Sequence, residues 1–551
     1  MIALSLAGCL VLTGCNKQQT EKTDTAEHTQ EWKTAETTPF GRYPEEVIYT
    51  LGKMTGMNNS NLPKGDTYED NGYTRYLKKQ LNVQNKDVFE AGENDNYQET
   101  VSMTIASREL PDVMVVNDMD MLQLLVDNDL IEDLTQVYEN CTSSRIKDIY
   151  NSYGSEILDN VTFDGKLMAL PETNIDDGPS LCWLRKDWMD KLGLDAPKTV
   201  EDVENIVHEF VQKDPGGNGK GETVGLVCDD ELTGGCGYSY EYQNDIIFAS
   251  FGAFPKQWIY NKDGEVVYGS VQNEAKAALG KLRKMYQQGT LDNNFLMRES
   301  SNIIELIVSG KCGSFFGPWW SPNNPLMSAM QKNPNAEWQP YLIQTDKDGQ
   351  TSFASQNPND KYVVVRKGYK HPEIVMKIVS VLFDDLRYDE EDVREMERYY
   401  QARPLAINVD YKDALMRCYD SLKDAIQGRK KLEDLGLLEG AYYISCSKYL
   451  DRKKDTSAQK SWEDWAAYAS RMTACSVLRK GQTRQVKSLF FGETKTMKSN
   501  WWRLEELEKK VYLEIVTGQK PLSYFDEFVK EWNRQGGEKI RGEVAQELKG
   551  K

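Results

Sequence analysis

Apolar and polar positions along the chain follow two periods, which predict strands and helices in alternation. A β-rich run at residues 47–51 precedes a stretch from Gly72 to Leu81 that favours a helix. The run DVMVV at residues 112–116 is apolar almost throughout, which is typical of a strand covered on both faces. A helix with one apolar stripe follows it. This alternation predicts an open α/β sheet built from βαβ units.

The alternation continues through the second half of the chain. LCWLRKDWMDKLGL predicts a strand that runs into a short helix ending at Gly193, and Thr199 is the expected N-cap of the helix after it. Residues 274–288 predict a further helix. YVVVRKG predicts a buried strand, and a helix is expected to begin at Pro372. Beyond about Arg403 the pattern is mostly helical.

The length of the chain and one irregular segment predict two lobes. A chain of 551 residues exceeds the size at which a single hydrophobic core stops growing. Around Pro171 the sequence LPETNIDDGPS has turn residues without periodicity, as expected where a chain crosses between lobes. We therefore assign residues 45–170 and 355–403 to lobe 1, and residues 171–354 and 404–551, with the C-terminal helices, to lobe 2.

The N-terminus predicts export. Residues 1–15, MIALSLAGCLVLTGC, are too short an apolar run for a stop-transfer helix and have the pattern of a signal peptide. LTGC resembles the bacterial lipobox, in which the cysteine, here Cys15, is lipidated; the alternative is a chance cysteine after a plain signal peptide. Residues 16–44 are polar and predict a flexible tether between membrane and body.

Charge and composition exclude several partners. The net charge of −19 argues against nucleic acid, which requires a basic surface, and against adhesion of the body to anionic lipids. An aromatic content of 10% beside this acidity is compatible with a neutral, polar ligand. The ten cysteines form no CxxC pair and there are only three histidines, which argues against a zinc site. Cys228 and Cys236 flank a glycine-rich loop and either pair or remain free thiols.

Several segments, in this order and spacing, resemble a known family. They are IASRELPDVMVV, DGKLMALP, LCWLRKDWMDKLGLDAPKT, LIVSGKCGSFFGPWW and VTGQKPLSYFDEFVKEWNRQGGEKIRGEV. The chain is similar to the extracellular solute-binding lipoproteins, family 1, of ABC importers, in particular the large oligosaccharide-binding branch of Gram-positive bacteria.

The resemblance implies a fold and a function. The implied fold is the two-lobed α/β fold of periplasmic binding proteins, with an interlobe ligand cleft and a helical C-terminal part. The implied function is that of a monomeric carrier, lipid-anchored on the extracellular face of the membrane, that hands an oligosaccharide unchanged to an ABC permease.

Aromatic residues are the first candidates for binding a sugar, because flat rings cover the apolar faces of a pyranose. Trp319 and Trp320 follow the strand KCGSFF, where maltodextrin-type binders of this family carry stacking tryptophans. Two adjacent indoles point to opposite faces, so we expect one to contact ligand and the other to pack into lobe 2. Trp258 and Tyr242 are further candidates, with core packing as the alternative.

Planar polar residues are the second group of candidates, because sugar hydroxyls pair with carboxylates, amides and guanidinium groups. Asn117 and Asp118 directly follow a predicted strand, although Asp118 also suits the N-cap of the next helix. Asp176, with Asp177, lies in the first crossover and either binds hydroxyls or shapes a turn. Arg403 lies in a later crossover and is expected to reach the ligand or an interlobe carboxylate.

One glycine-rich loop resembles the calcium loop of this branch. In DPGGNGKGETVG the EF-like donors would be Asp214, Asn218, the Lys220 carbonyl and Glu222, but Gly216 stands where an oxygen ligand is expected. The loop therefore predicts either a structural calcium ion or a turn that holds no metal. No other cofactor is expected.

Two other functions share parts of this pattern. A secreted glycan-degrading enzyme also combines tryptophans with carboxylates, but adjacent acidic residues such as Asp176 and Asp177 do not establish a catalytic pair. No Ser-His-Asp or Cys-His arrangement, P-loop or GxGxxG motif is present, so we expect no enzymatic activity. A lipoprotein that presents ligand to a sensor would have the same fold and cleft.

Overall fold

The computed structural model divides the chain into two compact units. Unit 1 comprises residues 1–173 and 359–409, and unit 2 comprises residues 174–358 and 410–551. The residues described are 29–55, 62–92, 95–234, 241–384, 401–454 and 461–550. The chain passes from one unit to the other three times, after Thr173, Pro358 and Val409.

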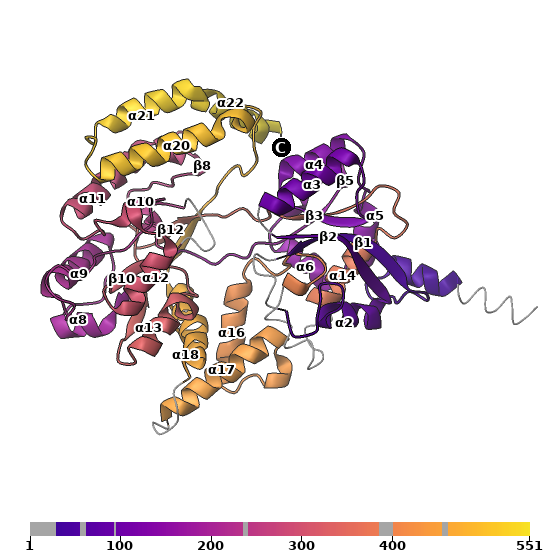
Figure 1. Cartoon of the computed structure of the whole chain (residues 1–551), viewed down its shortest axis with the longest axis horizontal. Coiled ribbons are helices and arrows are strands. Elements are labelled where there is room, and N and C mark those ends of the chain that lie inside the picture. The colour runs from indigo at the N-terminus through magenta and orange to yellow at the C-terminus, as the bar shows by residue number, and fades with distance from the viewer. Residues whose placement is uncertain are drawn as a thin grey trace, which may run out of the picture. The chain divides into compact units, whose positions relative to one another are not determined.

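Unit 1 is a mixed sheet with helices on both faces. Figure 1 shows α3 and α4 on one side of this sheet and α2 and α14 on the other. Its strands are β1 (Val47–Thr55), β2 (Val83–Gly92), β3 (Val113–Val116), β4 (Thr162–Phe163), β5 (Lys166–Leu167), β6 (Leu170–Pro171) and β13 (Tyr362–Val365). Its helices are α2 (Gly72–Leu81), α3 (Asp95–Ser107), α4 (Met119–Asp127), α5 (Thr135–Cys141), α6 (Ser144–Asn151), α7 (Glu156–Asp159) and α14 (Ile374–Phe383).

The five-stranded sheet of unit 1 has the order β2-β1-β3-β13-β6. The pairs β1–β2 and β1–β3 are parallel, as the βαβ pattern predicts, whereas β13 runs antiparallel to β3 and β6. Every residue of β3 and β13 is buried, which explains their continuous apolar sequences. The carboxyl ends of β1 and β3, the start of β13 and the end of β6 therefore share one edge of the sheet.

The second half of the expected tether is folded onto unit 1. Residues 29–37 form a helix, the Trp32 indole stacks on the His371 ring at 5.6 Å, and Tyr43 is fully buried. Lys377 of α14 donates hydrogen bonds to the carbonyls of Thr38 and Gly41. The prediction of a flexible segment over the whole of 16–44 is therefore wrong for residues 29–44, because tertiary packing of a few apolar side chains orders a segment whose average composition is polar.

Unit 2 is larger and mostly helical. Its strands are β7 (Leu181–Arg185), β8 (Trp258–Tyr260), β9 (Val266–Tyr268), β10 (Ser314–Gly317), β11 (Trp338–Tyr341), β12 (Thr351–Ala354) and β14 (Thr483–Val486). Its α-helices are α8 (Lys186–Leu192), α9 (Val200–Lys213), α10 (Asp245–Ala249), α11 (Asn273–Gln287), α12 (Ser300–Ser309), α13 (Met327–Lys332), α16 (Ala414–Ile426), α17 (Leu437–Lys454), α18 (Trp462–Tyr468), α19 (Cys475–Lys480), α20 (Met497–Val516), α21 (Tyr524–Trp532) and α22 (Glu538–Gly550).

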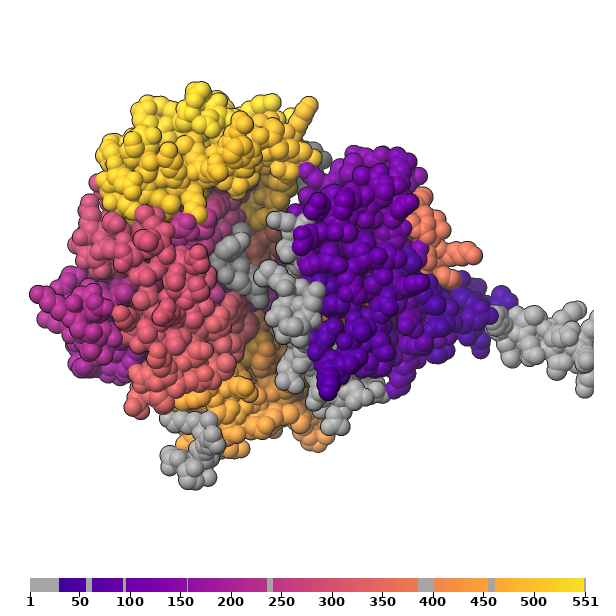
Figure 2. Space-filling view, in the orientation of Figure 1, coloured from indigo at the N-terminus to yellow at the C-terminus, as the bar shows by residue number. Residues whose placement is uncertain are grey.

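The central sheet of unit 2 has the order β10-β7-β11, with both outer strands antiparallel to β7. Leu181 pairs with Gly317, so the segment that enters β7 and the segment that leaves β10 lie at the same edge. The C-terminal helices α20–α22 share a hydrophobic core with α9 and α11, and they form one continuous layer in Figure 2. No helix in the described parts of the chain has the length and apolarity needed to cross a membrane.

The three crossover segments are hydrogen-bonded to one another. In unit 1 the Glu172 amide donates to the Lys361 carbonyl, and the Glu172 carboxylate accepts from the Asn408 amide. In unit 2 the Asn174 amide donates to the Pro358 carbonyl. The strand edges described above are thus the places where the crossovers join each unit.

Candidate ligand-binding site

The strongest candidate site lies at the edge of unit 2 where β7 begins and β10 ends. The antiparallel register brings Asp177, four residues before β7, to Trp319, two residues after β10. The Tyr242 amide donates to the Phe316 carbonyl at 2.9 Å, which adds residues 241–243 to the same edge. We call this set of segments, 176–178, 241–243 and 318–320, the unit 2 edge.

The turn after β10 is held by one carbonyl. The Pro318 oxygen accepts hydrogen bonds from the Trp183 indole at 3.2 Å, the Ser321 amide at 3.1 Å and the Ser321 hydroxyl at 2.8 Å. Gly317 precedes it at a point where an added Cβ would lie 2.7 Å from Ser321 Oγ. These contacts fix the positions of the two tryptophans that follow.

Trp319 is a buried, hydrogen-bonded residue of this edge. Its side chain is only 6% exposed and belongs to the hydrophobic core that also contains Trp183 and Phe315. Its Nε1 donates to Asp177 Oδ1 at 2.7 Å. The indole therefore links the segment before β7 to the segment after β10.

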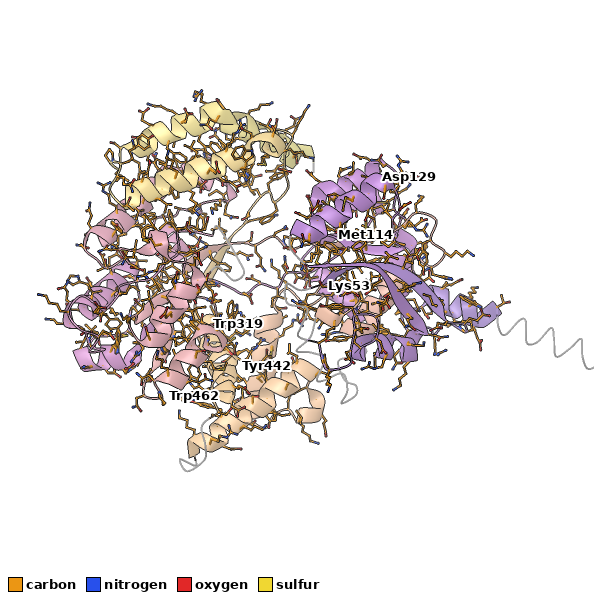
Figure 3. The ribbon with its side chains drawn as sticks, in the orientation of Figure 1. Lys53, Met114, Asp129, Trp319, Tyr442 and Trp462 are labelled. Atoms are coloured by element: carbon orange, nitrogen blue, oxygen red, sulfur yellow. The ribbon has the colours of Figure 1, made fainter. Side chains whose placement is uncertain are left out.

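A cation lies against the same indole. The Arg471 guanidinium is 4.3 Å from the centre of the Trp319 ring and 4.2 Å from the centre of the Tyr442 ring, and it donates to the Tyr442 hydroxyl at 3.1 Å. Figure 3 shows Trp319 and Tyr442 close together within unit 2. Arg471 lies in a π-helical segment, Ala469–Ala474, which continues α18. Two aromatic faces offset part of the cost of removing this charge from water.

Acidic groups of the edge carry raised pKa values and unpartnered oxygens. Burial raises the pKa of Asp177 to about 7, although the Trp319 hydrogen bond and the Arg471 charge act in the opposite direction. Burial alone raises the pKa of Glu241 to about 7. Within the described part of the chain, Asp177 Oδ2 and Glu241 Oε1 are buried and accept no hydrogen bond. Buried acceptors without a donor are costly, by about 1–3 kcal/mol each.

Trp320 differs from its neighbour in exposure and bonding. It is partly exposed and packs at the margin of the core that holds Trp319. Its Nε1 is buried and finds no acceptor among the residues that the structure describes. Trp320, rather than Trp319, thus has an indole with free surface and an unused donor.

Two further aromatic candidates are core residues. Trp258 is 4% exposed, packs on Tyr268 at 5.1 Å and on Trp501 at 6.2 Å, and helps to attach α20 to the β8–β9 hairpin. This packing supports the core-packing alternative for Trp258 over a contact with ligand. Tyr242 is 1% exposed and its ring packs against Phe315 at 5.7 Å, although its hydroxyl has no partner in the described ranges. Only the hydroxyl of Tyr242 remains a candidate contact.

Asp176 shapes the turn that leads to β7. Its Oδ1 accepts from the Gly178 amide at 3.0 Å and its Oδ2 accepts from Gln485 Nε2 at 3.0 Å. Both oxygens are therefore used, which supports the turn-forming alternative over ligand binding. Asp177, the next residue, is the one with an unused oxygen.

At the corresponding edge of unit 1, Asn117 and Asp118 are the two candidate residues. Asn117 directly follows β3, and its Oδ1 is buried without a hydrogen bond from any described residue. Asp118 is the N-cap of α4, where its Oδ1 accepts from the Asp120 amide at 2.7 Å. The structure thus gives Asp118 a helix-capping role and leaves Asn117 as the ligand candidate of unit 1.

Arg403 is held inside unit 1. It is 9% exposed, and its guanidinium lies over the rings of Tyr73 at 5.6 Å and Phe383 at 4.8 Å. Its carbonyl accepts from Nζ of Lys53, a fully buried lysine of β1 that is labelled in Figure 3. This packing does not support the expected contact of Arg403 with ligand.

The glycine-rich loop does not fit a calcium ion. Asp214 Oδ1 accepts from the Asn218 amide at 2.9 Å and from Thr223 Oγ1 at 2.6 Å, and these bonds, with Thr223 first, lower the pKa of Asp214. Glu222 pairs with Lys311 at 3.0 Å, and Lys220 is exposed. A Cβ at position 216 would lie 2.5 Å from Trp188, so no oxygen ligand fits there without movement. The loop is closed by its own hydrogen bonds.

The other candidates for metal binding or disulfide formation are the remaining His, Cys, Asp and Glu side chains. Among the described residues no group of three or more His, Cys, Asp or Glu side chains is arranged to hold a metal. Cys228 is a buried free thiol, and Cys236, its possible partner, lies outside the described residues, as does Cys15.

Sequence reasoning missed Arg471 and Tyr442. Both lie in the C-terminal helical part, more than a hundred residues after Trp319, and no local motif marks them. The one available signal was a basic residue in the apolar context AAYASRMTAC, which indicates a buried charge that needs partners.

Comparison with known proteins identifies a family and several relatives that match part of the chain. The sequence model of the family described as bacterial extracellular solute-binding protein matches residues 73–384. "Lipoprotein LipO" of Bacillus subtilis is 26% identical over 223 residues, which cover 40% of this chain and 41% of LipO. "Polygalacturonan/rhamnogalacturonan-binding protein YtcQ" of the same organism is 26% identical over 258 residues, 45% of this chain and 47% of YtcQ. The chain thus spans about half the length of these curated relatives.

A solved structure covers more of the chain. The ABC-transporter substrate-binding protein FusA of S. pneumoniae, in complex with kestose, matches 91% of this chain and 99% of its own, with 15% identity and a TM-score of 0.58. The match extends over both units and shows that the chain has the same α/β fold as this structure.

Proposed function

The chain belongs to the bacterial extracellular solute-binding protein family, and from this we propose that it captures an oligosaccharide outside the cell and delivers it to the permease of an ABC importer. Capture in a cleft between the two units is the expectation from the sequence. The names of two relatives support a carbohydrate, since YtcQ is named for binding polygalacturonan and rhamnogalacturonan and FusA is named as the substrate-binding protein of a fructooligosaccharide ABC transporter.

One observation carries the proposal. The unit 2 edge combines a partly exposed indole, Trp320, with a buried carboxyl, Asp177, one of whose oxygens has no donor among the described residues. A sugar supplies what both lack, because its ring face covers an indole and its hydroxyls donate to carboxylates. Trp319 and Arg471 then support this surface from within unit 2.

We further propose that Cys15 carries a lipid that anchors the monomeric protein to the outer face of the membrane. The LTGC sequence supports this, and residues 1–28 lie outside the described part of the chain. Because residues 29–43 pack on unit 1, only the residues between Cys15 and position 29 would act as a tether. Globomycin-sensitive processing and metabolic labelling with palmitate, both lost in Cys15→Ala, test the anchor.

The proposed role is binding without catalysis. Asp176 and Asp177 are adjacent, and Asp176 uses both oxygens in turn contacts, so this pair does not offer an acid and a base on opposite sides of a glycosidic bond. Incubation of purified protein with oligosaccharides, followed by chromatography, is expected to recover every sugar intact. Release of shorter sugars would favour the glycan-degrading alternative.

The direct test of the proposal is a binding screen. Intrinsic tryptophan fluorescence and thermal shift are measured against neutral and acidic oligosaccharides of several linkages. We expect saturable binding of at least one oligosaccharide and a raised melting temperature, because a ligand that binds only the folded state stabilises it. Binding of amino acids or peptides, and of no sugar, would contradict the proposal.

A further inference from the structure

We propose that the unit 2 edge selects uncharged sugars over uronic acids, and that Asp177 is the residue that sets this preference. This inference rests on the proposed function and specifies the class of oligosaccharide. It follows from which polar atoms of the edge lack partners and from the charges around them.

The unused atoms of the edge are mainly acceptors. Asp177 Oδ2, Glu241 Oε1 and Gln243 Oε1 are buried, and none receives a hydrogen bond from the described residues. The other atoms of two of these side chains are engaged, since Asp177 Oδ1 accepts from Trp319 at 2.7 Å and Gln243 Nε2 donates to Asp229 at 3.3 Å. The ligand that completes such a surface must bring donors. Sugar hydroxyls donate, whereas a uronate carboxylate only accepts.

The charges at the edge also favour an uncharged ligand. Asp176, Asp177 and Glu241 contribute three carboxyl groups, and Arg471 is the guanidinium that interacts electrostatically with Asp177. Burial raises the pKa of Asp177 and of Glu241 to about 7, so near neutral pH both carboxyls are partly ionised, and a further anion placed beside them adds repulsion. A ligand hydroxyl adds no charge and donates to the unpaired acceptor oxygen.

Arg471 is the group that would favour an acidic ligand, and its geometry limits that role. Its guanidinium lies 4.3 Å from the centre of the Trp319 ring and 4.2 Å from the centre of the Tyr442 ring, and one N–H group already binds the Tyr442 hydroxyl. The arrangement suits a cation that supports the Trp319–Asp177 pair. We therefore assign Arg471 a positioning role and Asp177 the contact with ligand.

The test compares neutral and acidic ligands of equal length. Purified protein is titrated by calorimetry with neutral trisaccharides to hexasaccharides (maltose-, fructose- and xylose-based series) and with oligogalacturonides of the same lengths. We expect the tightest ligand to be neutral and at least tenfold tighter than the oligogalacturonide of equal length. A tighter oligogalacturonide, with binding that is lost in Arg471→Met, would overturn the inference while leaving the proposed function intact.

One variant isolates the role of Asp177. In Asp177→Asn the amide oxygen can still accept from Trp319, and the amide nitrogen then replaces Oδ2 with a donor. We expect the ratio of neutral to acidic affinity to fall at least tenfold. Glu508→Gln is the control, because Glu508 is also a buried carboxyl of unit 2, with a pKa raised to about 7, but it lies in α20 bonded to Ser270. For Glu508→Gln we expect the ratio of neutral to acidic affinity to stay within twofold of the wild-type ratio.

The remaining outcomes are also decisive. If Asp177→Asn binds both series in the original ratio, Asp177 does not select the ligand and the inference is wrong. If Asp177→Asn fails to fold, Glu241→Gln is used in its place, because it changes another acceptor of the same edge. Its ratio of neutral to acidic affinity is then compared with the wild-type ratio. A folded wild-type protein that binds neither series would contradict the proposed function itself, and the inference with it.

Discussion

The two strand edges that carry candidate ligand residues are built very differently. At the unit 2 edge, Trp319 donates a hydrogen bond to Asp177, and Arg471 lies over the Trp319 ring. The Pro318 carbonyl accepts three hydrogen bonds that hold the turn after β10. At the unit 1 edge, Asp118 caps its own helix and the amide oxygen of Asn117 has no bond from a described residue. The candidate residues of the first edge are held in place by one another, whereas Asn117 at the second edge is a single polar group.

This difference assigns separate roles to the two units. A preorganised surface loses little freedom when a ligand binds, so it is the better source of affinity. Single polar groups such as Asn117 contribute hydrogen bonds of modest net strength. We therefore expect substitutions in unit 2 to have large effects on stability and binding, and the equivalent substitution in unit 1 to have a small one.

The largest effect is expected at Trp319. Trp319→Ala removes a buried indole, the hydrogen bond to Asp177 and one of the two aromatic faces on Arg471. Large-to-small changes of this kind cost about 3–5 kcal/mol. Urea unfolding followed by circular dichroism measures the loss, and Trp319→Phe, which removes only the N–H donor and part of the ring, should lose less than half as much. A fully stable Trp319→Ala would show that the edge is not held by this indole.

Trp320→Ala is expected to separate binding from stability. Trp320 is partly exposed at the margin of the core, so its removal should change the unfolding free energy by less than that of Trp319. Loss of a stacking surface should weaken oligosaccharide binding by about 1–3 kcal/mol. Calorimetry with the tightest ligand from the screen measures this. Unchanged affinity would exclude Trp320 as the stacking residue.

Stability is expected to depend on pH through buried carboxyls in both units. Burial raises the pKa of Glu172 to about 8 and that of Asp177 to about 7. Both folded-state pKa values lie above the pKa of the same carboxyl in the unfolded chain. Between the unfolded and the folded pKa the folded protein therefore binds more protons than the unfolded protein, and its stability falls as the pH rises through that range. The melting temperature should therefore be higher at pH 5.5 than at pH 8.5, by roughly 2–4 °C for each kcal/mol involved.

Matched variants assign this pH dependence to its source. Glu172→Gln and Asp177→Asn should each flatten the curve of melting temperature against pH, with Glu172→Gln acting at the higher pH. Asp413→Asn, which changes an exposed carboxyl paired with Arg417, should leave the curve unchanged. A melting temperature that rises from pH 5.5 to 8.5 would contradict the sign of the effect.

The smallest effect is expected in unit 1. Asn117→Ala removes one planar polar group at the end of β3, and the loss of a single hydrogen bond to ligand corresponds to about 0.5–1.5 kcal/mol. The unfolding transition should be unchanged, because Asn117 Oδ1 bonds to no described residue. A loss of affinity larger than that of Trp320→Ala would reverse the roles of the two units.

Local sequence patterns predicted the regular elements well. The helix expected from Gly72 to Leu81 has those bounds, and Thr199 is the N-cap of α9 with Asp202 completing the capping box. The strand and short helix before Gly193 are also present, with Gly193 in a left-handed conformation. These features depend on neighbours in sequence, which explains why the α/β fold could be predicted.

Features that depend on distant contacts could not be predicted in the same way. The polar composition of residues 29–44 gave no indication that Trp32 and Tyr43 pack beside α14. Trp258 lies in a core completed by Trp501, more than two hundred residues later. Arg471 reaches Trp319 only because α18 and its π-helical continuation fold back onto the turn after β10. Burial and partner choice at these positions are tertiary properties.

A crystal structure of the protein with the tightest oligosaccharide from the binding screen tests the central claim most directly. We predict a neutral sugar whose hydroxyl donates to Asp177 Oδ2 and whose ring lies over the Trp320 indole, with Trp319 still bonded to Asp177. A sugar bound elsewhere, with Asp177 Oδ2 and Trp320 both free of it, would contradict the assignment of the unit 2 edge as the ligand-binding surface.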